Sequence, residues 1–326
     1  MMRSRRAVVL RTLALVSFLL LPPATPAASA PAGLLVALTA GGVDPEVLIQ
    51  RLVELGREAD FVGYEQTTVF RPVRYSSRQK VTQKDGARRI LYLYPPGLKG
   101  KEIYIEGPLV IFDDQATVAP GIPLGKDLRQ LRKQALPNDR VAGRPTYVVE
   151  VRPARSGDSR RIWIDAEKWV PLRWEDRNRA GALLSRTTYT SIEFSSDLPP
   201  IPPPAPAPKA LPQQMSLKEA EKLAGFRASI PTYLPRGYRR QVVTVTTIGK
   251  GQRLAHSISM RFSNGLDILT LFQAPARAIE DAPRPGQFRV SSFGQLVWVR
   301  GDLHYVLEAP ASLSRDELMK IARSVK

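Results

Sequence analysis

The chain has 326 residues, of which 43% are hydrophobic and 24% charged; it contains no cysteine, and its net charge is +18. This length supports two modest hydrophobic cores. The absence of cysteine excludes thiol catalysis, cysteine-based zinc sites, disulfides and acylation of a lipobox cysteine.

The first residues predict a secretory signal peptide over residues 1–32. Arginines at positions 3, 5, 6 and 11 precede the apolar run Leu13–Leu21, which is too short to span a bilayer comfortably. Ala30-Pro31-Ala32 fits a small-x-small cleavage pattern that leaves Gly33 first. A second apolar patch, Leu34–Leu38, leaves open a longer, uncleaved anchor. In either case we expect a periplasmic or otherwise extracytoplasmic protein.

The next segment, 43–197, predicts one helix followed by many short strands. Asp44-Pro45 is typical of a helix start, and Leu48, Leu52, Leu55 and Ala59 share one helix face. Strands are expected over 61–70, 75–83, 88–94, 102–106, 109–112, 147–151, 161–165, 172–176 and 183–194, with a second short helix over roughly Lys126–Ala135. This order favours an α+β fold with an antiparallel curved sheet, or half-barrel, packed on helices.

The last of these strands suggests which side chains line a hollow in that sheet. In Leu183–Phe194, Leu184, Ile192 and Phe194 share one parity, while Ser185, Thr187 and Glu193 share the other. A curved sheet of this kind can close over the amphipathic helix and leave an apolar site. The candidate ligand-pocket residues are Leu184, Ile192, Phe194, Leu52 and Leu55.

A proline-rich linker over 198–212 separates this part from a second one. So many prolines remove backbone donors and fix φ, which favours an extended, semi-rigid spacer. The segment 213–326 then predicts a small α+β domain with one antiparallel sheet. Its signals are a capping box at Ser216 and Glu219, the hairpin turn Asn264-Gly265, and a final helix capped at Ser314.

The second part is the more basic of the two. Residues 33–208 hold 26 basic and 21 acidic side chains, a net charge of +5; residues 209–326 hold 18 and 9, a net charge of +9. Arg236, Arg239 and Arg240 cluster beside a Pro-rich loop and are the candidate partner-binding residues. An acidic protein segment or a membrane surface is the expected partner outside the cytoplasm, rather than nucleic acid. A generally solvated basic face is the alternative.

No constellation of catalytic residues is evident, so we expect no enzyme and no cofactor or metal. The two histidines, His256 and His304, lie in separate predicted strands, and the common nucleophile and metal motifs are absent. Asp113-Asp114 is more typical of a solvated turn than of a metal site. Glu175 and Asp176 are expected to pair with Arg173 or Arg177. The four tryptophans could line a ligand surface, although buried packing is commoner.

Several stretches resemble the RseB/MucB family of sigma-factor regulatory proteins. They are Phe61-Val62-Gly63-Tyr64, the strand Arg140–Pro153 with its Val-Ala-Gly-Arg start, Arg161–Asp165 followed by Val170–Glu175, and the strand ending at Phe194. In the second part, Pro231–Tyr238 and the helix after Leu313 are similar to C-terminal domains attached to such proteins. The N-terminal pattern is shared with lipoprotein carriers of the LolA type.

The resemblance implies a non-catalytic binding protein of two domains. The first would be a LolA-like half-barrel that holds an acyl chain or peptide, and the second would dock on a membrane anti-sigma factor. A competing ligand would then release that factor by a population shift. The alternative is a periplasmic lipid or lipoprotein carrier of LolA type.

The export prediction has a direct test. N-terminal sequencing of the protein recovered outside the cytoplasm is expected to begin near Gly33. Recovery of the chain from the cytoplasm with Met1 intact would contradict export.

Overall fold

The computed structural model describes residues 43–70, 74–107, 109–112, 115–118, 131–154, 157–204, 213–248, 251–290 and 295–326. The predicted signal peptide, 1–32, and residues 205–212 of the predicted linker lie outside these ranges. The chain divides between Lys209 and Ala210 into two compact units. We call their described parts, 43–204 and 213–326, the N-terminal and C-terminal units.

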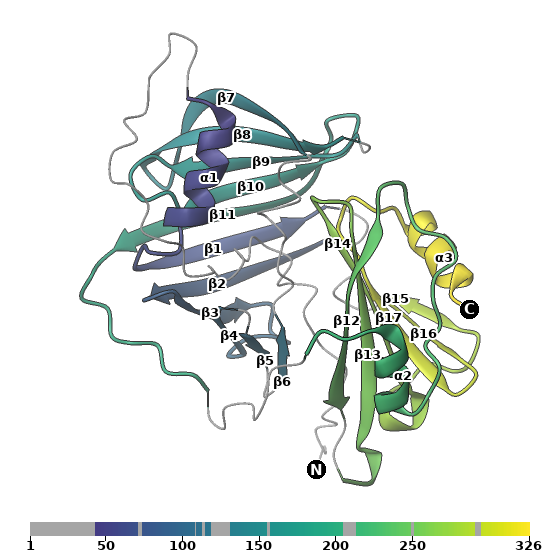
Figure 1. The fold of residues 1–326 in the computed structure, drawn as a ribbon. Coiled ribbons are helices and arrows are strands. Elements are labelled where there is room, and N and C mark those ends of the chain that lie inside the picture. The colour runs from purple at the N-terminus through teal and green to yellow at the C-terminus, as the bar shows by residue number, and fades with distance from the viewer. Residues whose placement is uncertain are drawn as a thin grey trace. The chain divides into compact units, whose positions relative to one another are not determined.

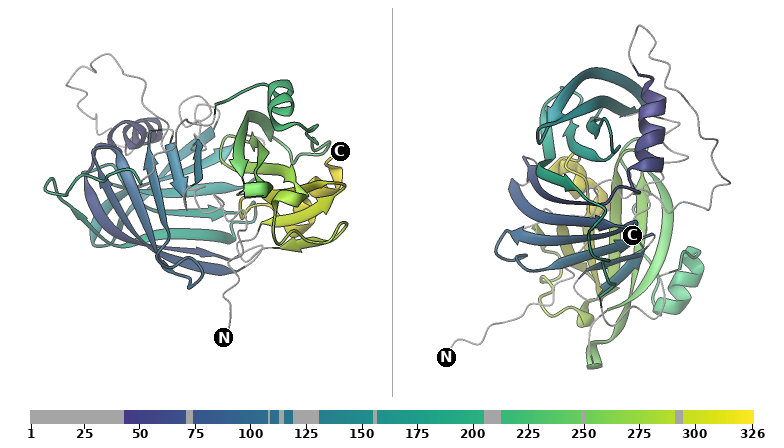
Figure 2. Two further views of the ribbon diagram at one scale, coloured as in Figure 1. Left: turned by 90° about the horizontal axis from the view of Figure 1, so that it is seen from below. Right: turned by 90° about the vertical axis from the view of Figure 1, so that its left-hand side faces the viewer.

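The N-terminal unit is one eleven-stranded antiparallel sheet with a helix against it (Figure 1). In chain order its elements are α1 (Pro45–Leu55), β1 (Phe61–Val69), β2 (Tyr75–Lys84), β3 (Ala87–Tyr94), β4 (Glu102–Glu106), β5 (Leu109–Phe112), β6 (Gln115–Val118), β7 (Leu131–Val141), β8 (Arg144–Pro153), β9 (Ser159–Asp165), β10 (Pro171–Arg177) and β11 (Leu183–Phe194). Figure 2 shows how strongly the sheet curves.

Two meanders make up this sheet, and one pairing joins them. Strands β1 to β6 form the first and β7 to β11 the second, each with sequential antiparallel neighbours. The join is β1 on β11, with Phe61 opposite Phe194 and Thr67 opposite Thr187. Phe61 lies edge-on to both Tyr189 and Phe194, with ring centroids 5.8 Å apart in each pair. The expected α+β fold with a curved antiparallel sheet is confirmed.

Helix α1 begins where the sequence predicts. The Asp44 carboxylate accepts a hydrogen bond of 2.8 Å from the Glu46 backbone N–H, and Pro45 occupies the first turn. Leu48, Ile49 and Leu52 are buried against the sheet. The exposed end of the helix is tied down as well, because Lys133 of β7 lies 2.7 Å from the Glu46 carboxylate.

The helix expected over Lys126–Ala135 is wrong in its described part. Residues 126–130 lie outside the described ranges, and Leu131–Val141 is strand β7, which pairs with β8 along its length. The prediction rested on the helical spacing of Leu128 and Leu131. Strand β7 is at the edge of the sheet and few of its residues are buried, so its sequence shows little of the alternation that identifies a strand. The register of β7 shifts between Leu136 and Asp139. Strand β6 is likewise not among the strands predicted from the sequence.

The C-terminal unit is a six-stranded antiparallel sheet with two helices. Its elements are α2 (Leu217–Ala224), β12 (Arg239–Ile248), the 3-10 turn Gly251–Arg253, β13 (Ala255–Ser263), β14 (Ile268–Pro275), the 3-10 turn Ala276–Ala278, β15 (Phe288–Val290), β16 (Leu296–Arg300), β17 (Leu303–Glu308) and α3 (Arg315–Ser324), with strand order β12-β13-β14-β17-β16-β15. The predicted capping box is present, since Ser216 and Glu219 exchange hydrogen bonds.

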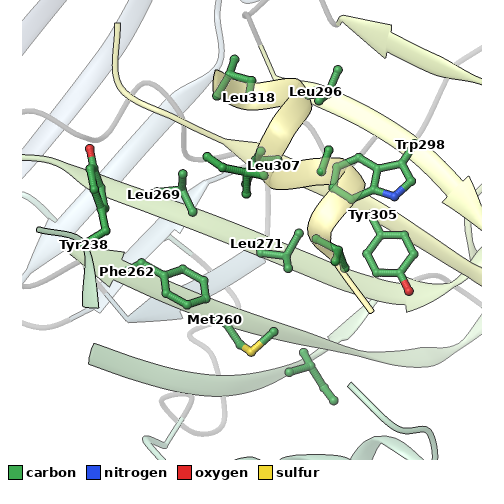
Figure 3. Close-up of a cluster of buried hydrophobic side chains, with 14 of the residues drawn as sticks. Tyr238, Met260, Phe262, Leu269, Leu271, Leu296, Trp298, Tyr305, Leu307 and Leu318 are labelled. Atoms are coloured by element: carbon green, nitrogen blue, oxygen red, sulfur yellow. The ribbon is translucent and has the colours of Figure 1, made fainter. Parts of the chain in front are cut away.

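The core of this unit lies between the sheet and its helices (Figure 3). Trp298 stacks on Tyr305 with ring centroids 5.0 Å apart and planes at 6°. Met260, Phe262 and Leu271 are at most 1% exposed. The predicted Asn264-Gly265 turn closes β13 onto β14: Gly265 takes φ +91°, and the side-chain Oδ1 of Asn264 accepts from the Asp267 backbone N–H at 2.7 Å.

Each unit has its own core, so each is expected to fold alone. Fragments covering the predicted domains 43–197 and 213–326 should each show one cooperative thermal transition by circular dichroism. If one fragment shows no cooperative transition while the full chain shows one, the predicted boundary is wrong.

Candidate ligand-binding and partner-binding surfaces

One face of the N-terminal sheet is defined by its contact with the end of α1. The amide nitrogen of Gln83, in β2, donates to the carbonyl oxygens of Gly56, Arg57 and Ala59 at 3.2, 3.2 and 2.7 Å. We call the side of the sheet on which Gln83 lies the α1 face. Because side chains alternate along a strand, the register assigns every second residue of β1, β2 and β11 to this face.

The α1 face is buried, yet over β1 and β2 it is largely polar. In β1 the residues in phase with Phe61 are all buried, and in β2 those in phase with Gln83 are buried from Ser77 onward. Five of these side chains carry polar groups: Glu65, Thr67, Ser77, Gln79 and Gln83. The buried side of these two strands is therefore polar at the middle of the sheet.

The predicted pocket residues do not form one row, because β11 contains a bulge. The β1–β11 register shifts between Tyr64 and Glu65, so that Thr190 is an extra residue. Ile192 and Phe194 thereby join the face of Thr187 and Ser185, contrary to the predicted parity. Both pack on the cluster around Phe61.

The other candidate pocket residues lie elsewhere. Leu184 is 4% exposed and is the extra residue of a second shift, opposite Asp176 and Arg177 of β10. Both remaining candidates are residues of α1: Leu52 is fully buried, whereas Leu55 is 36% exposed. Of the five candidates, the structure brings Ile192 and Phe194 together beside Phe61.

Sequence reasoning missed the most unusual residue of the α1 face, Glu65. Its side chain lies opposite Gln79 of β2 and Tyr189 of β11. No hydrogen bond or ion pair joins its carboxyl to another residue in the described part of the chain. Burial raises the pKa of Glu65 to about 7, against a smaller opposing effect of Arg88. A charged residue in phase with Phe61, Gly63 and Val69 is the sequence signal that could have found it.

Two further polar atoms on this face, Ser77 Oγ and Gln79 Oε1, have no hydrogen-bond partner among the described residues, although the Gln79 side chain hydrogen-bonds Tyr92. The next row shows what a satisfied arrangement looks like, since the hydroxyls of Thr67 and Thr187 lie 2.8 Å apart. Each unsatisfied buried group costs about 1–3 kcal/mol of stability. Unsatisfied polar groups gathered on one face indicate a place where a ligand or water supplies the missing bonds.

The sequence-predicted catalytic and metal candidates show no functional arrangement. Glu175 pairs with Arg177 at 2.5 Å, as expected, and also with Arg186 at 2.7 Å. His304 is buried, and burial lowers its pKa to about 4. Among the described residues no group of His, Asp and Glu is placed to hold a metal. Asp113 and Asp114 lie outside the described residues. All four tryptophans are buried.

In the C-terminal unit, Arg236, Arg239 and Arg240 are all exposed. Arg236 lies in the loop before β12, where Gly237 takes φ +94°, and the two others begin β12, the edge strand of the sheet. Buried Tyr238 lies between them in the chain and packs in the core. The three arginines are thus exposed within five residues of chain, and strand alternation places Arg239 and Arg240 on opposite faces of the sheet.

The raised pKa of Glu65 predicts a measurable pH dependence. The folded chain binds the Glu65 proton more tightly than the unfolded chain does, so low pH favours the folded state. This stabilisation is complete below pH 4.5, the ordinary pKa of the group, and is lost as pH rises through about 7. The loss is about 3 kcal/mol. Denaturant unfolding at several pH values should show it in the wild type and not in Glu65→Gln. The control is Glu193→Gln, an exposed carboxyl on the opposite face of the sheet; identical pH profiles for wild type and Glu65→Gln would contradict the prediction.

Comparison with known proteins agrees with this description. Residues 129–215 match the model of the MucB/RseB N-terminal domain. The complex of Pseudomonas aeruginosa MucA and MucB superposes with a TM-score of 0.55 at 18% identity, covering 87% of this chain and 99% of that one. A crystal structure of MucB gives 0.53 at 17% identity, covering 87% and 98%. MucB in complex with MucA(peri) gives 0.52 at 18% identity, with the same coverage. The comparison with curated proteins found no match. Residues 129–215 thus resemble the MucB/RseB N-terminal domain, and the fold of the chain across both units is similar to that of MucB.

Proposed function

We propose that this chain is an exported, non-catalytic regulator that binds the extracytoplasmic part of a membrane anti-sigma factor. The observation that carries the proposal is the likeness of 87% of the chain, in both units, to MucB structures, two of which contain MucA. The resemblance to the MucB/RseB family implies the anti-sigma partner. Among the described helices, none is long and apolar enough to cross a membrane.

The N-terminal unit is the proposed receiver of the signal. On the buried α1 face of its curved sheet, Ile192 and Phe194 pack beside Phe61. The Gln79 side chain hydrogen-bonds Tyr92, whereas its Oε1 atom, Ser77 Oγ and the Glu65 carboxyl have no hydrogen-bond partner among the described residues. An apolar cluster next to unpaired polar groups suits an amphipathic ligand, such as a lipid or a peptide. Leu52, on the buried side of α1, lies within the same unit.

The C-terminal unit is the proposed docking part. Its charge of +9 exceeds the +5 of the first part, and the Arg236, Arg239 and Arg240 cluster is exposed. Charges on a surface of this kind chiefly accelerate association with a partner of opposite sign. Backbone held by Pro235 and by a buried Tyr238 lowers the cost of ordering the cluster on binding.

A ligand that binds the N-terminal unit would act by differential affinity. If it binds the partner-free form more tightly than the complex, it releases the anti-sigma factor by mass action, and linkage makes the effect reciprocal. Bound partner must therefore lower the affinity for the ligand by the same factor by which bound ligand lowers the affinity for the partner. This reciprocity separates a regulator from a carrier, whose cargo has no such coupling to an anti-sigma factor.

The partner proposal predicts a salt-dependent association. An envelope pull-down with the full chain, read by mass spectrometry, should recover an anti-sigma factor. Replacing Arg236, Arg239 and Arg240 with serine should then slow association with that factor's extracytoplasmic segment by about tenfold at low salt and leave the melting temperature nearly unchanged. Stopped-flow measurements at low and high salt would give the rates.

The matched control removes three exposed cationic side chains from α3 and the end of the chain, with Arg315, Arg323 and Lys326 each changed to serine. It should associate at close to the wild-type rate. Equal slowing by both triple variants would make the effect one of net charge alone. Recovery of lipid but no anti-sigma factor would favour the carrier.

A further inference from the structure

Four adjacent strands place a row of polar side chains side by side on the α1 face. Glu65 of β1 lies opposite Tyr189 of β11 and Gln79 of β2, and Gln79 lies opposite Tyr92 of β3. Their exposed fractions are 8%, 3%, 3% and 1% in the order Glu65, Tyr189, Gln79, Tyr92. We call these four residues the polar row. Ser77, one row along β2, lies opposite Thr67.

The polar row lies where no described helix covers the sheet. Helix α1 packs chiefly against β7 and β8, at one end of the strand order, whereas β1 to β3 lie near its middle (Figure 1). No described helix supplies donors or acceptors to this part of the face. Among the described residues, Ser77 Oγ, Gln79 Oε1 and the Glu65 carboxyl have no hydrogen-bond partner here.

The hydrogen-bonding groups of the polar row, together with Ser77 in the next row, favour an uncharged ligand group. Gln79 Oε1 can only accept a hydrogen bond, and Ser77 and a protonated Glu65 can both donate and accept. A cationic group would meet Arg88 and Arg57; burial and, to a smaller extent, repulsion by Arg88 lower the pKa of Arg57 to about 10. An anionic group would be repelled by Glu65 once that carboxyl is ionised, above about pH 7. Arg88 is also engaged, because its Nε and Nη2 donate to Gln83 Oε1 at 3.0 and 2.5 Å.

Apolar side chains continue the same face on one side of the row. Ile192, Gly63, Val81 and Ile90 lie opposite one another on β11, β1, β2 and β3, and the Tyr189 ring covers Gly63, which leaves Ile192, Val81 and Ile90 as the apolar side chains of this row. A ligand that spans both rows has a hydrocarbon part beside these residues and a hydrogen-bonding part beside Glu65. Plain hydrocarbon would leave the three polar groups unpaired.

We propose that Glu65, Ser77 and Gln79 form a binding site for an uncharged amide or hydroxyl group on an otherwise apolar ligand. The inference rests on the proposed role of the N-terminal unit as the receiver of a ligand, and it adds the chemical class that the unit selects. An amide N–H or a hydroxyl supplies the donor that Gln79 Oε1 needs. The oxygen of the same group accepts from Glu65 or Ser77.

Binding at this site follows the protonation of Glu65. The titratable groups that face it are Arg88 and Tyr92 from β3, Tyr75 from β2 and Tyr189 from β11, with Arg57 beyond Arg88. Burial raises the pKa of all three tyrosines, so they stay neutral near pH 7. Glu65 is thus the group that changes charge there, and the ionised form can no longer donate to the ligand.

Three probes with the same tail test the proposal on the full chain. N-Dodecanoylglycine amide carries an amide donor, 1-dodecanoylglycerol carries hydroxyl donors, and methyl dodecanoate carries no donor. Titration calorimetry below the concentration at which each aggregates gives the affinities. At about pH 6, at least one donor probe should bind about tenfold more tightly than the ester. The amide and glycerol arms show which of the two groups the site prefers.

Variants connect that preference to the polar row. Gln79→Leu should remove most of the tenfold preference, while Gln66→Leu, on the exposed face of β1, should keep it. Wild-type affinity for the donor probe should fall severalfold from about pH 6 to about pH 8. In Glu65→Gln it should stay constant, whereas Glu193→Gln should behave as the wild type.

Four results would overturn the proposal. They are equal affinity for the ester and both donor probes, an unchanged preference in Gln79→Leu, the same pH dependence in Glu65→Gln as in the wild type, and no saturable binding of any probe, which would leave water as the occupant. Anti-sigma binding, measured on the same proteins, keeps the two proposals apart. Loss of probe selectivity with the partner still bound rejects this inference alone, and loss of the partner alone rejects the docking proposal.

Discussion

The pairing of β1 with β11 is the interaction on which the N-terminal unit depends. It joins strands from opposite ends of the unit, and without it the sheet would be two separate meanders. Closing so long a loop costs chain entropy before any contact repays it. Contacts at the join offset this entropy cost, and among them are those of the Phe61 ring with Tyr189 and Phe194. The extra residue at Thr190 sets which β11 side chains share that face.

The same join explains why the α1 face has two characters. Near Phe61 the face is apolar, and a few residues along β1 it is lined by Glu65, Thr67 and their neighbours, all buried. A protein that needed only stability would replace unpaired polar groups there with hydrocarbon. Keeping them is consistent with a face that recognises something, and it gives the unit a charge that changes near neutral pH.

Local patterns were enough to predict much of the fold. Alternation located β1, β2 and β11 to within a residue or so at each end, and the caps at Asp44 and Ser216 and the Asn264-Gly265 turn were read from short motifs. Long-range facts were not accessible. The bulge at Thr190 reverses the parity of Ile192, and only the partner strand reveals it. Leu131–Ala135 has weak alternation, so its pairing with β8 decided its structure. The site was missed because the sequence does not distinguish Glu65 from a surface glutamate. Its burial becomes evident only when its cross-strand neighbours, Tyr189 and Gln79, are known.

An open sheet has two ends, and at one of them the strand β7 is poorly suited to extend it. Pro137 lacks an N–H, the register breaks between Leu136 and Asp139, and Arg132, Asp139 and Arg140 are exposed along the strand. A second copy that approached this edge would find an interrupted set of donors and acceptors flanked by charge. The irregularity that hid β7 from sequence analysis therefore guards a cysteine-free chain against edge-to-edge aggregation.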